Sequence, residues 1–133
     1  MTKYFLDSNV CIYAFSTFEI DKQNIALALL ENKFVVSPQV IIETYNTLKR
    51  KKIVLPTQLD LVVNMFLNTA IVQAIDNNII TNGLFVKNKY QFSFLDSLIV
   101  ASALKAGCTV LYSEDMHQGL VIENSLTIIN PFI

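Results

Sequence analysis

Four acidic residues stand at positions where an enzyme could use them, because each follows an apolar segment or begins one. They are Asp7, Glu43, Asp96 and Asp115. Two carboxylates about 5 Å apart repel each other by about 3 kcal/mol at an effective dielectric constant near 20. A cluster of four would therefore raise some of their pKa values or require cations among them. Oxygen ligands favour Mg²⁺ or Mn²⁺ over zinc, and His117 is the only histidine, so a divalent-metal site of this kind is the chemistry to expect.

The first two acids also have simpler structural interpretations. Asp7 follows the apolar run Tyr4 to Leu6 and could be a turn residue or the N-cap of a helix that begins near Val10. Glu43 lies on the second turn of an expected helix, where an acid can simply point to solvent. Neither residue establishes a site by itself.

The other two acids are equally ambiguous when each is taken alone. Asp96 follows Ser93 by three residues, which resembles a capping box, although Glu or Gln is the usual partner in that motif. Asp115 could be a turn acid or the cap of a short helix. Glu114, directly before it, could equally be the ligand.

Strands and helices alternate along the chain. Apolar and β-branched runs predict strands at 3–6, 34–36, 70–74, 109–112 and 126–129, and helical spacing of apolar residues predicts helices at 21–33, 37–50, 57–67, 76–90 and 93–106. We expect Ser37, Thr57 and Ser93 to cap three of these helices, with Pro38 at a first helical position and Gly107 ending the last helix. This alternation predicts a parallel sheet covered by helices on both faces.

Such a topology would bring the four acids to one edge of the sheet. In open parallel sheets, sites form beyond the carboxyl ends of the strands, near the point where strand order reverses. Asp7 and Asp115 follow the first and fourth expected strands, whereas Glu43 and Asp96 lie in early turns of helices. Convergence of the four, and not any single acid, is the signal that predicts a metal site.

The composition agrees with one compact unit spanning residues 1–133. The chain has 133 residues, 53% of them hydrophobic, and a net charge of −1, which neither requires nor excludes a nucleic-acid partner. No apolar stretch reaches the roughly 18 to 20 residues of a membrane span, and the N-terminus lacks a signal-peptide pattern, so we expect a cytoplasmic protein. Cys11 and Cys108 have apolar neighbours and are expected to be buried free thiols.

Four segments resemble motifs of one known family. They are Tyr4 to Val10 (YFLDSNV), Gln39 to Glu43 (QVIIE), Phe94 to Ala103 (FLDSLIVASA) and Leu111 to Met116 (LYSEDM). Each motif is weak alone, but their order and spacing resemble the PIN-domain ribonucleases, and among these the VapC-type toxins of toxin–antitoxin pairs. The likeness extends over nearly the whole chain. Serine stands at positions 8 and 113, where the family often has threonine, and the hydroxyl is retained.

The resemblance implies a fold, an activity and partners. The fold would be a three-layer α/β/α sandwich around a central, mainly parallel sheet of four to five strands. The activity would be Mg²⁺- or Mn²⁺-dependent cleavage of RNA, and the partners a cognate antitoxin and a second copy of the chain. By similarity the metal-binding, catalytic acids would be Asp7, Glu43, Asp96 and Asp115, with Asn9, Ser113 and Glu114 as polar supports.

One basic run offers a candidate for RNA contact, and its members are Lys49, Arg50, Lys51 and Lys52. A solvated helix end, favoured by the helix dipole, explains the same run. Among other functions, a dehalogenase-like phosphotransferase would use Asp7 as nucleophile but needs a second Asp at position 9, where this chain has asparagine. A non-catalytic receiver-like or PIN-like metal-binding module is the remaining alternative.

Overall fold

A computed structural model describes residues 2–133 of the chain, and its centre is a six-stranded sheet. The strands are β1 (Tyr4–Leu6), β2 (Val35–Val36), β3 (Ile71–Val72), β4 (Val110–Tyr112), β5 (Val121–Ile122) and β6 (Leu126–Ile129). Their order across the sheet is β3-β2-β1-β4-β6-β5. All neighbouring pairs are parallel except β5 with β6, which is antiparallel. Strand order therefore reverses between β1 and β4.

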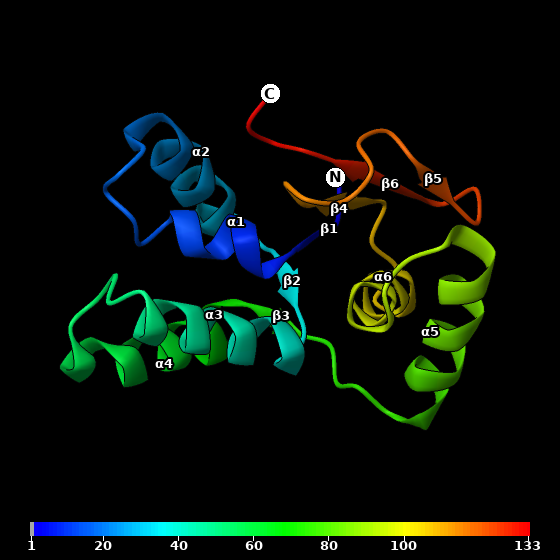
Figure 1. The fold of residues 1–133 in the computed structure, drawn as a ribbon, viewed down its shortest axis with the longest axis horizontal. Helices are drawn as coiled ribbons and strands as arrows, with labels where there is room; N and C mark the ends of the chain where they lie inside the picture. Colours follow the sequence, from blue (N-terminus) through cyan, green and yellow to red (C-terminus); the bar gives the residue numbers. More distant parts are fainter. Residues whose placement is uncertain (1) are drawn as a thin grey trace.

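Six α-helices and one short 3₁₀ turn connect the strands. They are α1 (Ser8–Tyr13), α2 (Ile20–Glu31), α3 (Pro38–Arg50), η1 (Pro56–Gln58), α4 (Leu59–Thr69), α5 (Asn77–Tyr90) and α6 (Phe94–Lys105). Figure 1 shows α1 and α2 on one side of the strands, α5 and α6 on the other, and α3 with α4 as a hairpin. The helices of residues 2–133 are too short or too polar to span a lipid bilayer.

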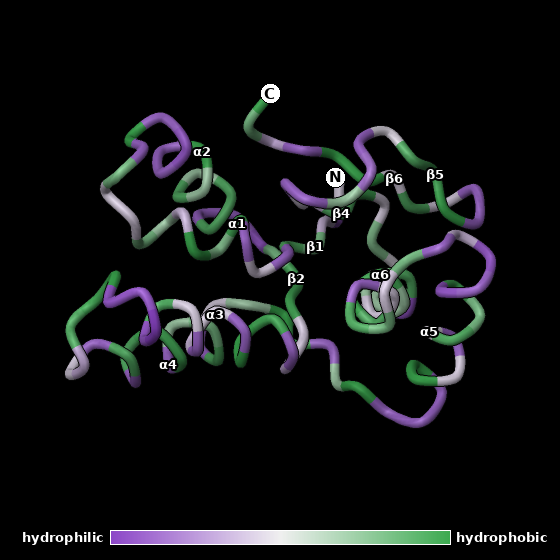
Figure 2. Tube along the Cα trace, in the orientation of Figure 1, coloured by the Kyte–Doolittle hydropathy of each residue, from purple (hydrophilic) through white to green (hydrophobic). Residues whose placement is uncertain are grey.

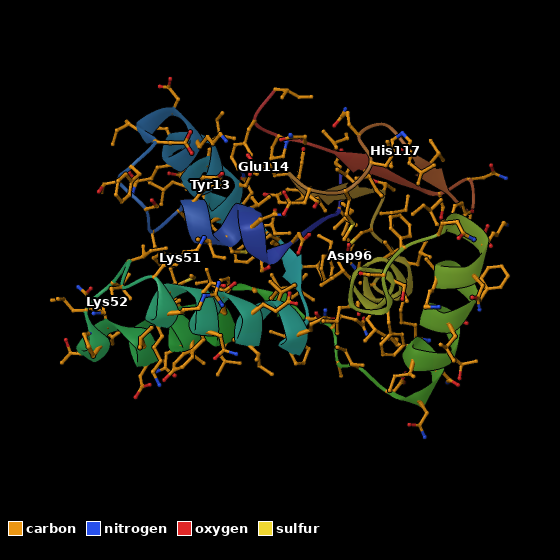
Figure 3. All side chains as sticks on the ribbon, viewed as in Figure 1. Tyr13, Lys51, Lys52, Asp96, Glu114 and His117 are labelled. Atoms are coloured by element: carbon orange, nitrogen blue, oxygen red, sulfur yellow. The ribbon has the colours of Figure 1, made fainter. Side chains whose placement is uncertain are left out.

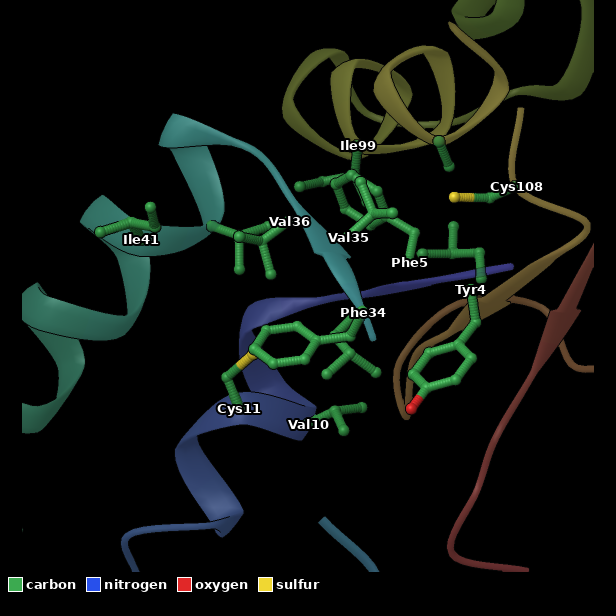
Figure 4. Close-up of a cluster of buried hydrophobic side chains, with 14 of the residues drawn as sticks. Tyr4, Phe5, Val10, Cys11, Phe34, Val35, Val36, Ile41, Ile99 and Cys108 are labelled. Carbon is green, nitrogen blue, oxygen red and sulfur yellow. The ribbon is translucent and has the colours of Figure 1, made fainter. Parts of the chain in front are cut away.

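The core lies on both faces of the central strands. Figure 4 shows Ile99 of α6 on one face of β1 and β2, and Val10 and Cys11 of α1 on the other. These three side chains are buried, as is Cys108, so both cysteines are the buried free thiols expected from the sequence. The chain in Figure 2 is hydrophobic along β2 and hydrophilic near the start of α2. The expected three-layer α/β/α arrangement with a mainly parallel sheet is confirmed.

The structure corrects several details of the sequence interpretation. The sheet has one strand more than expected, because β5 contributes two residues that pair only with β6. Thr57 does not cap a helix: it lies inside η1, and α4 begins at Leu59. Ser37 precedes α3 as expected, but its side chain makes no capping hydrogen bond. By contrast, Ser93 does cap α6, and Gly107 follows it with a left-handed φ of 75°.

Candidate functional site at the carboxyl ends of β1 and β4

The site begins where the two central strands end side by side. Leu6 of β1 pairs with Tyr112 of β4, and the backbone N–H of Asp7 donates to the Tyr112 carbonyl at 3.0 Å. This is the point at which strand order reverses. The residues after both strands, Asp7 and the segment from Ser113, are therefore held against each other by the sheet itself.

Asp7 is the buried centre of the site. Its side chain is only 7% exposed, and it accepts hydrogen bonds from the Ser113 hydroxyl at 2.9 Å and from the Ser8 backbone N–H at 2.7 Å. Burial raises the pKa of Asp7 to about 6, the two hydrogen bonds oppose that rise, and the nearby carboxylates of Glu43 and Asp96 add to it. As the N-cap of α1, Asp7 has the structural role considered above, but its burial and acidic neighbours go beyond what a cap needs.

Asn9 joins α1 to the loop that follows β4. Its side-chain Nδ2 donates to Asp115 Oδ2 at 3.2 Å and to Ser113 Oγ at 3.4 Å. Its Oδ1 accepts from the backbone N–H of Glu114 at 3.2 Å. A continuous set of hydrogen bonds thus runs from Asp7 through Ser113 and Asn9 to Asp115, and it fixes where the Asp115 carboxylate lies.

The other two acids approach from α3 and α6. Glu43 lies on the second turn of α3, and Gln39 Nε2, one turn earlier, donates to Glu43 Oε2 at 3.4 Å and to the Leu95 carbonyl at 3.0 Å. Asp96 lies in the first turn of α6, next to Leu95. Burial raises the pKa of Asp96, the Ser93 hydroxyl opposes the rise, and the charge of Asp115 adds to it. Gln39 therefore connects the helices that carry Glu43 and Asp96.

Glu114 points to other partners. Its carboxylate receives hydrogen bonds from Lys22 Nζ at 2.7 Å and from the Tyr13 hydroxyl at 2.8 Å. Burial by itself would raise the pKa of Glu114, but these two hydrogen bonds hold it below its ordinary value. In Figure 3, Glu114 and Tyr13 lie together near α1 and α2, away from Asp96 at the start of α6. Of the two adjacent acids, Asp115 is the one that accepts a hydrogen bond from Asn9 and whose charge raises the pKa of Asp96.

Three residues of this site were missed from the sequence. Lys22 and Tyr13 lie far from Glu114 in sequence, and no pattern in the chain pairs them. Gln39 had a signal, since it precedes Glu43 by four residues and so occupies the same helix face. Among the residues that the structure describes, the buried Oε1 of Gln39 has no hydrogen-bond partner.

The donor set fits a hard divalent cation. Within residues 2–133, none of the four carboxylates forms an ion pair with a basic side chain. In the same part of the chain, no three acidic, histidine or cysteine side chains already lie close enough to hold a metal ion between them. Both observations agree with a site for Mg²⁺, because this ion is usually bound by only one or two carboxylates and keeps several water ligands. A buried carboxylate with a raised pKa and no basic partner, Asp7, is the clearest place for such a charge.

The basic run divides between two hollows. Lys51 lines a hollow of about 370 Å³ that also contains Asn9 and Asp115. Lys49 and Lys52 line a different one, beside Leu55 and Leu59. Of these three lysines, Lys51 is the one that shares a hollow with a candidate acid, Asp115.

Comparison with known proteins adds a family and a set of similar folds. The PIN-domain model matches residues 4–120. Among solved structures, a toxin–antitoxin complex from Klebsiella pneumoniae superposes with a TM-score of 0.72 at 17% identity, covering 97% of this chain and 98% of that one. VapC20 of Mycobacterium tuberculosis, described as a Sarcin-Ricin loop cleaving toxin, gives 0.68 at 18% identity, covering 85% and 90%. DNA-bound VapBC from Salmonella typhimurium gives 0.68 at 16% identity, covering 96% and 97%. No curated protein sequence matches.

Proposed function

This chain belongs to the PIN-domain family, and from that premise we propose that it is a metal-dependent endoribonuclease that acts as the toxin of a toxin–antitoxin pair. The observation that carries the proposal is an electrostatic link among four acids beyond the ends of β1 and β4: Glu43 and Asp96 raise the pKa of Asp7, and Asp115 raises that of Asp96. Within residues 2–133, no basic side chain is paired with any of these acids. Family membership sets aside the dehalogenase-like and receiver-like alternatives.

The four acids would hold Mg²⁺ or Mn²⁺. When bound, such an ion supplies positive charge to a phosphodiester and activates water for its hydrolysis. Asp7 and Asp96 are the firmest candidates for direct ligands, because their pKa values are raised by burial and by neighbouring carboxylates. Glu43 and Asp115 would complete the cluster directly or through water.

The residues around the acids have positioning roles in this proposal. Ser113 and the Ser8 backbone N–H keep Asp7 in one rotamer and favour its ionised form. Asn9 orients Asp115, and Gln39 sets the spacing between α3 and α6. Preorganisation of this kind matters because a ligand that must reorient on binding loses affinity and rate.

RNA as substrate and an antitoxin as partner are supported by the neighbours in fold. One of them is described as a toxin that cleaves the Sarcin-Ricin loop, and two come from toxin–antitoxin complexes. These neighbours are only 16% to 18% identical to the chain, and likeness at that level shows a shared fold alone. We therefore include an RNA substrate, an antitoxin partner, a homodimer and a cytoplasmic location in the proposal.

Cleavage of bulk RNA by the purified protein tests the proposed function. We expect cleavage with Mg²⁺ or Mn²⁺, none after EDTA, and restoration when metal is added back. Asp7→Asn and Asp96→Asn should each remove the activity, whereas Asp60→Asn, on the exposed side of α4, should retain it. Cleavage that persists in EDTA, or in both site variants, would overturn the proposal. Metal binding without cleavage would favour the non-catalytic PIN-like module.

A further inference from the structure

A hollow of about 370 Å³ extends from the candidate site along α1, and its volume lies in the range of about 300 to 1,000 Å³ typical of ligand pockets. Asn9 and Asp115 of the candidate site line it. The other residues that line it are Ile12, Tyr13, Ser16, Phe18, Thr47, Lys51, Ile53 and Glu114. Its walls come from α1 and the segment after it on one side, and from the end of α3 on the other.

The hollow contains both a basic side chain, which could bind a phosphate group, and a candidate metal-binding acid. Lys51 follows the last residue of α3, and no ion pair within residues 2–133 engages it. Lys22, the other cation nearby, is already paired with Glu114. Lys51 is therefore the cation of this hollow that is free to meet an anionic group, while Asp115, which also lines it, has no basic partner within residues 2–133.

Phe18 supplies an aromatic surface at the rim. It is 97% exposed, in the segment between α1 and α2, and no aromatic or cation contact within residues 2–133 involves it. Tyr13, by contrast, already contacts Phe132 edge-on at 4.9 Å and Lys22 at 4.8 Å. An aromatic face beside a free cation is how proteins hold single-stranded nucleic acid, the ring stacking on a base and the cation meeting a phosphate.

We propose that this hollow holds the single-stranded RNA segment next to the cleaved phosphodiester, with a phosphate at Lys51 and a base against Phe18. The inference rests on the proposed function and adds to it a strand conformation and two substrate-binding residues. It also divides the basic run, because Lys49 and Lys52 face the neighbouring hollow. In Figure 3, Lys51 and Lys52 lie near each other at the end of the α3–α4 hairpin, so a change at either alters the local charge equally.

The test is steady-state cleavage of a labelled single-stranded RNA pool of randomised sequence by the full chain in Mg²⁺. Lys51→Gln and Phe18→Ala are each expected to raise KM about fivefold or more with little change in kcat, since they remove binding outside the acid cluster. Lys51→Gln should also reduce the salt dependence of RNA binding by about one phosphate contact. Lys52→Gln should change KM much less.

Matched controls separate this proposal from the function on which it rests. Lys33→Gln removes a lysine at the opposite end of the strands, and Phe85→Ala removes a half-exposed ring on α5. Both should leave KM unchanged, and thermal melts should show that every variant is folded. A wild-type protein that cleaves no RNA overturns the proposed function and this inference together. Wild-type cleavage with an unaltered KM in Lys51→Gln and Phe18→Ala overturns this inference alone. If these two variants also bind a partner protein more weakly, the hollow is a binding site for that protein and not for RNA.

Discussion

The Ser113 hydroxyl donates a 2.9 Å hydrogen bond to Asp7 Oδ2 across 106 positions of sequence, and both side chains are buried. This contact affects the charge state of Asp7. Of the two hydrogen bonds that lower the Asp7 pKa, it makes the larger contribution. It also makes the buried carboxylate dependent on a residue that follows another strand, β4.

Removing that hydroxyl should shift the pH dependence of RNA cleavage. Ser113→Ala withdraws a hydrogen bond from the ionised form of Asp7, so its pKa should rise above the value of about 6. Because the ionised form is the one that binds metal, the acidic limb of the pH–rate profile should move to higher pH by about one unit. Ser113→Thr keeps the hydroxyl and should retain the original profile. An unchanged limb in Ser113→Ala would contradict this role.

Asp7→Asn should stabilise the metal-free protein while it removes activity. Burial raises the pKa of Asp7 from 3.8 in the unfolded chain to about 6, so ionisation costs folding free energy. The cost is absent below pH 3.8, grows as the pH rises to about 6, and stays constant above. At 1.36 kcal/mol per pKa unit its upper limit is about 3 kcal/mol.

Chemical denaturation in EDTA measures this effect. At pH 7, Asp7→Asn should unfold at a higher denaturant concentration than the wild type, by about 1 to 3 kcal/mol of stability. At pH 4 the advantage should largely disappear, since the wild-type carboxyl is then protonated in the folded state. A variant that is less stable than the wild type at pH 7 would show that Asp7 is stabilised by a partner.

Glu114 and Asp115 should behave differently although they are adjacent. Asp115→Asn should weaken metal binding and cleavage by about 10- to 100-fold, in the range typical of residues around a metal site. Glu114→Gln keeps one acceptor oxygen for Lys22 or Tyr13, and it should change both properties by much less because Glu114 points to those partners. Calorimetric titration with Mn²⁺ compares the two variants directly. Equal losses would mean that Glu114 also serves the metal.

Gln39 should be a positioning residue whose replacement alters metal affinity. Gln39→Ala removes the hydrogen bond to the Leu95 carbonyl and lets α3 and α6 separate, so Mn²⁺ should bind more weakly in a protein that remains folded. Gln39→Glu should lose the same hydrogen bond, because it faces the Leu95 carbonyl with an acceptor, but its added negative charge beside Glu43 should recover part of the Mn²⁺ affinity. Metal titration with a thermal melt as control checks both variants, and unaltered affinity in Gln39→Ala would rule the role out.

Long periodic segments and capping signals allowed most of the fold to be predicted from sequence. The strand at β1 and the helices at α3, α5 and α6 follow from apolar spacing, with Pro38 and Ser93 as start signals for α3 and α6. The two-residue strand β5 could not be predicted, because it exists only through pairing with β6. The prediction that Thr57 caps a helix was wrong because Thr57 lies within a 3₁₀ turn that begins at Pro56, and α4 begins only at Leu59.

The part of the site that follows directly after strands could be predicted from the sequence. Asp7 and Asp115 follow strands, so the topology alone brings them to one edge, where the structure has them linked through Ser113 and Asn9. The choice between Asp115 and Glu114 depended on Lys22 and Tyr13, whose approach is a tertiary event with no local signal. The metal-binding roles of the four acids remain predictions for the experiments above.

The hydrogen bonds that join Asp7 and Asn9 to Ser113, Asp115 and the Glu114 amide have a consequence for protein synthesis. A ribosome that has translated only as far as Tyr112 has produced Asp7, Asn9, Glu43 and Asp96 but neither Ser113 nor Asp115. The nascent chain therefore cannot assemble this centre until the segment after β4 has been made and has left the exit tunnel. If the protein degrades RNA as proposed, its activity can begin only once Ser113 and Asp115 have joined the site.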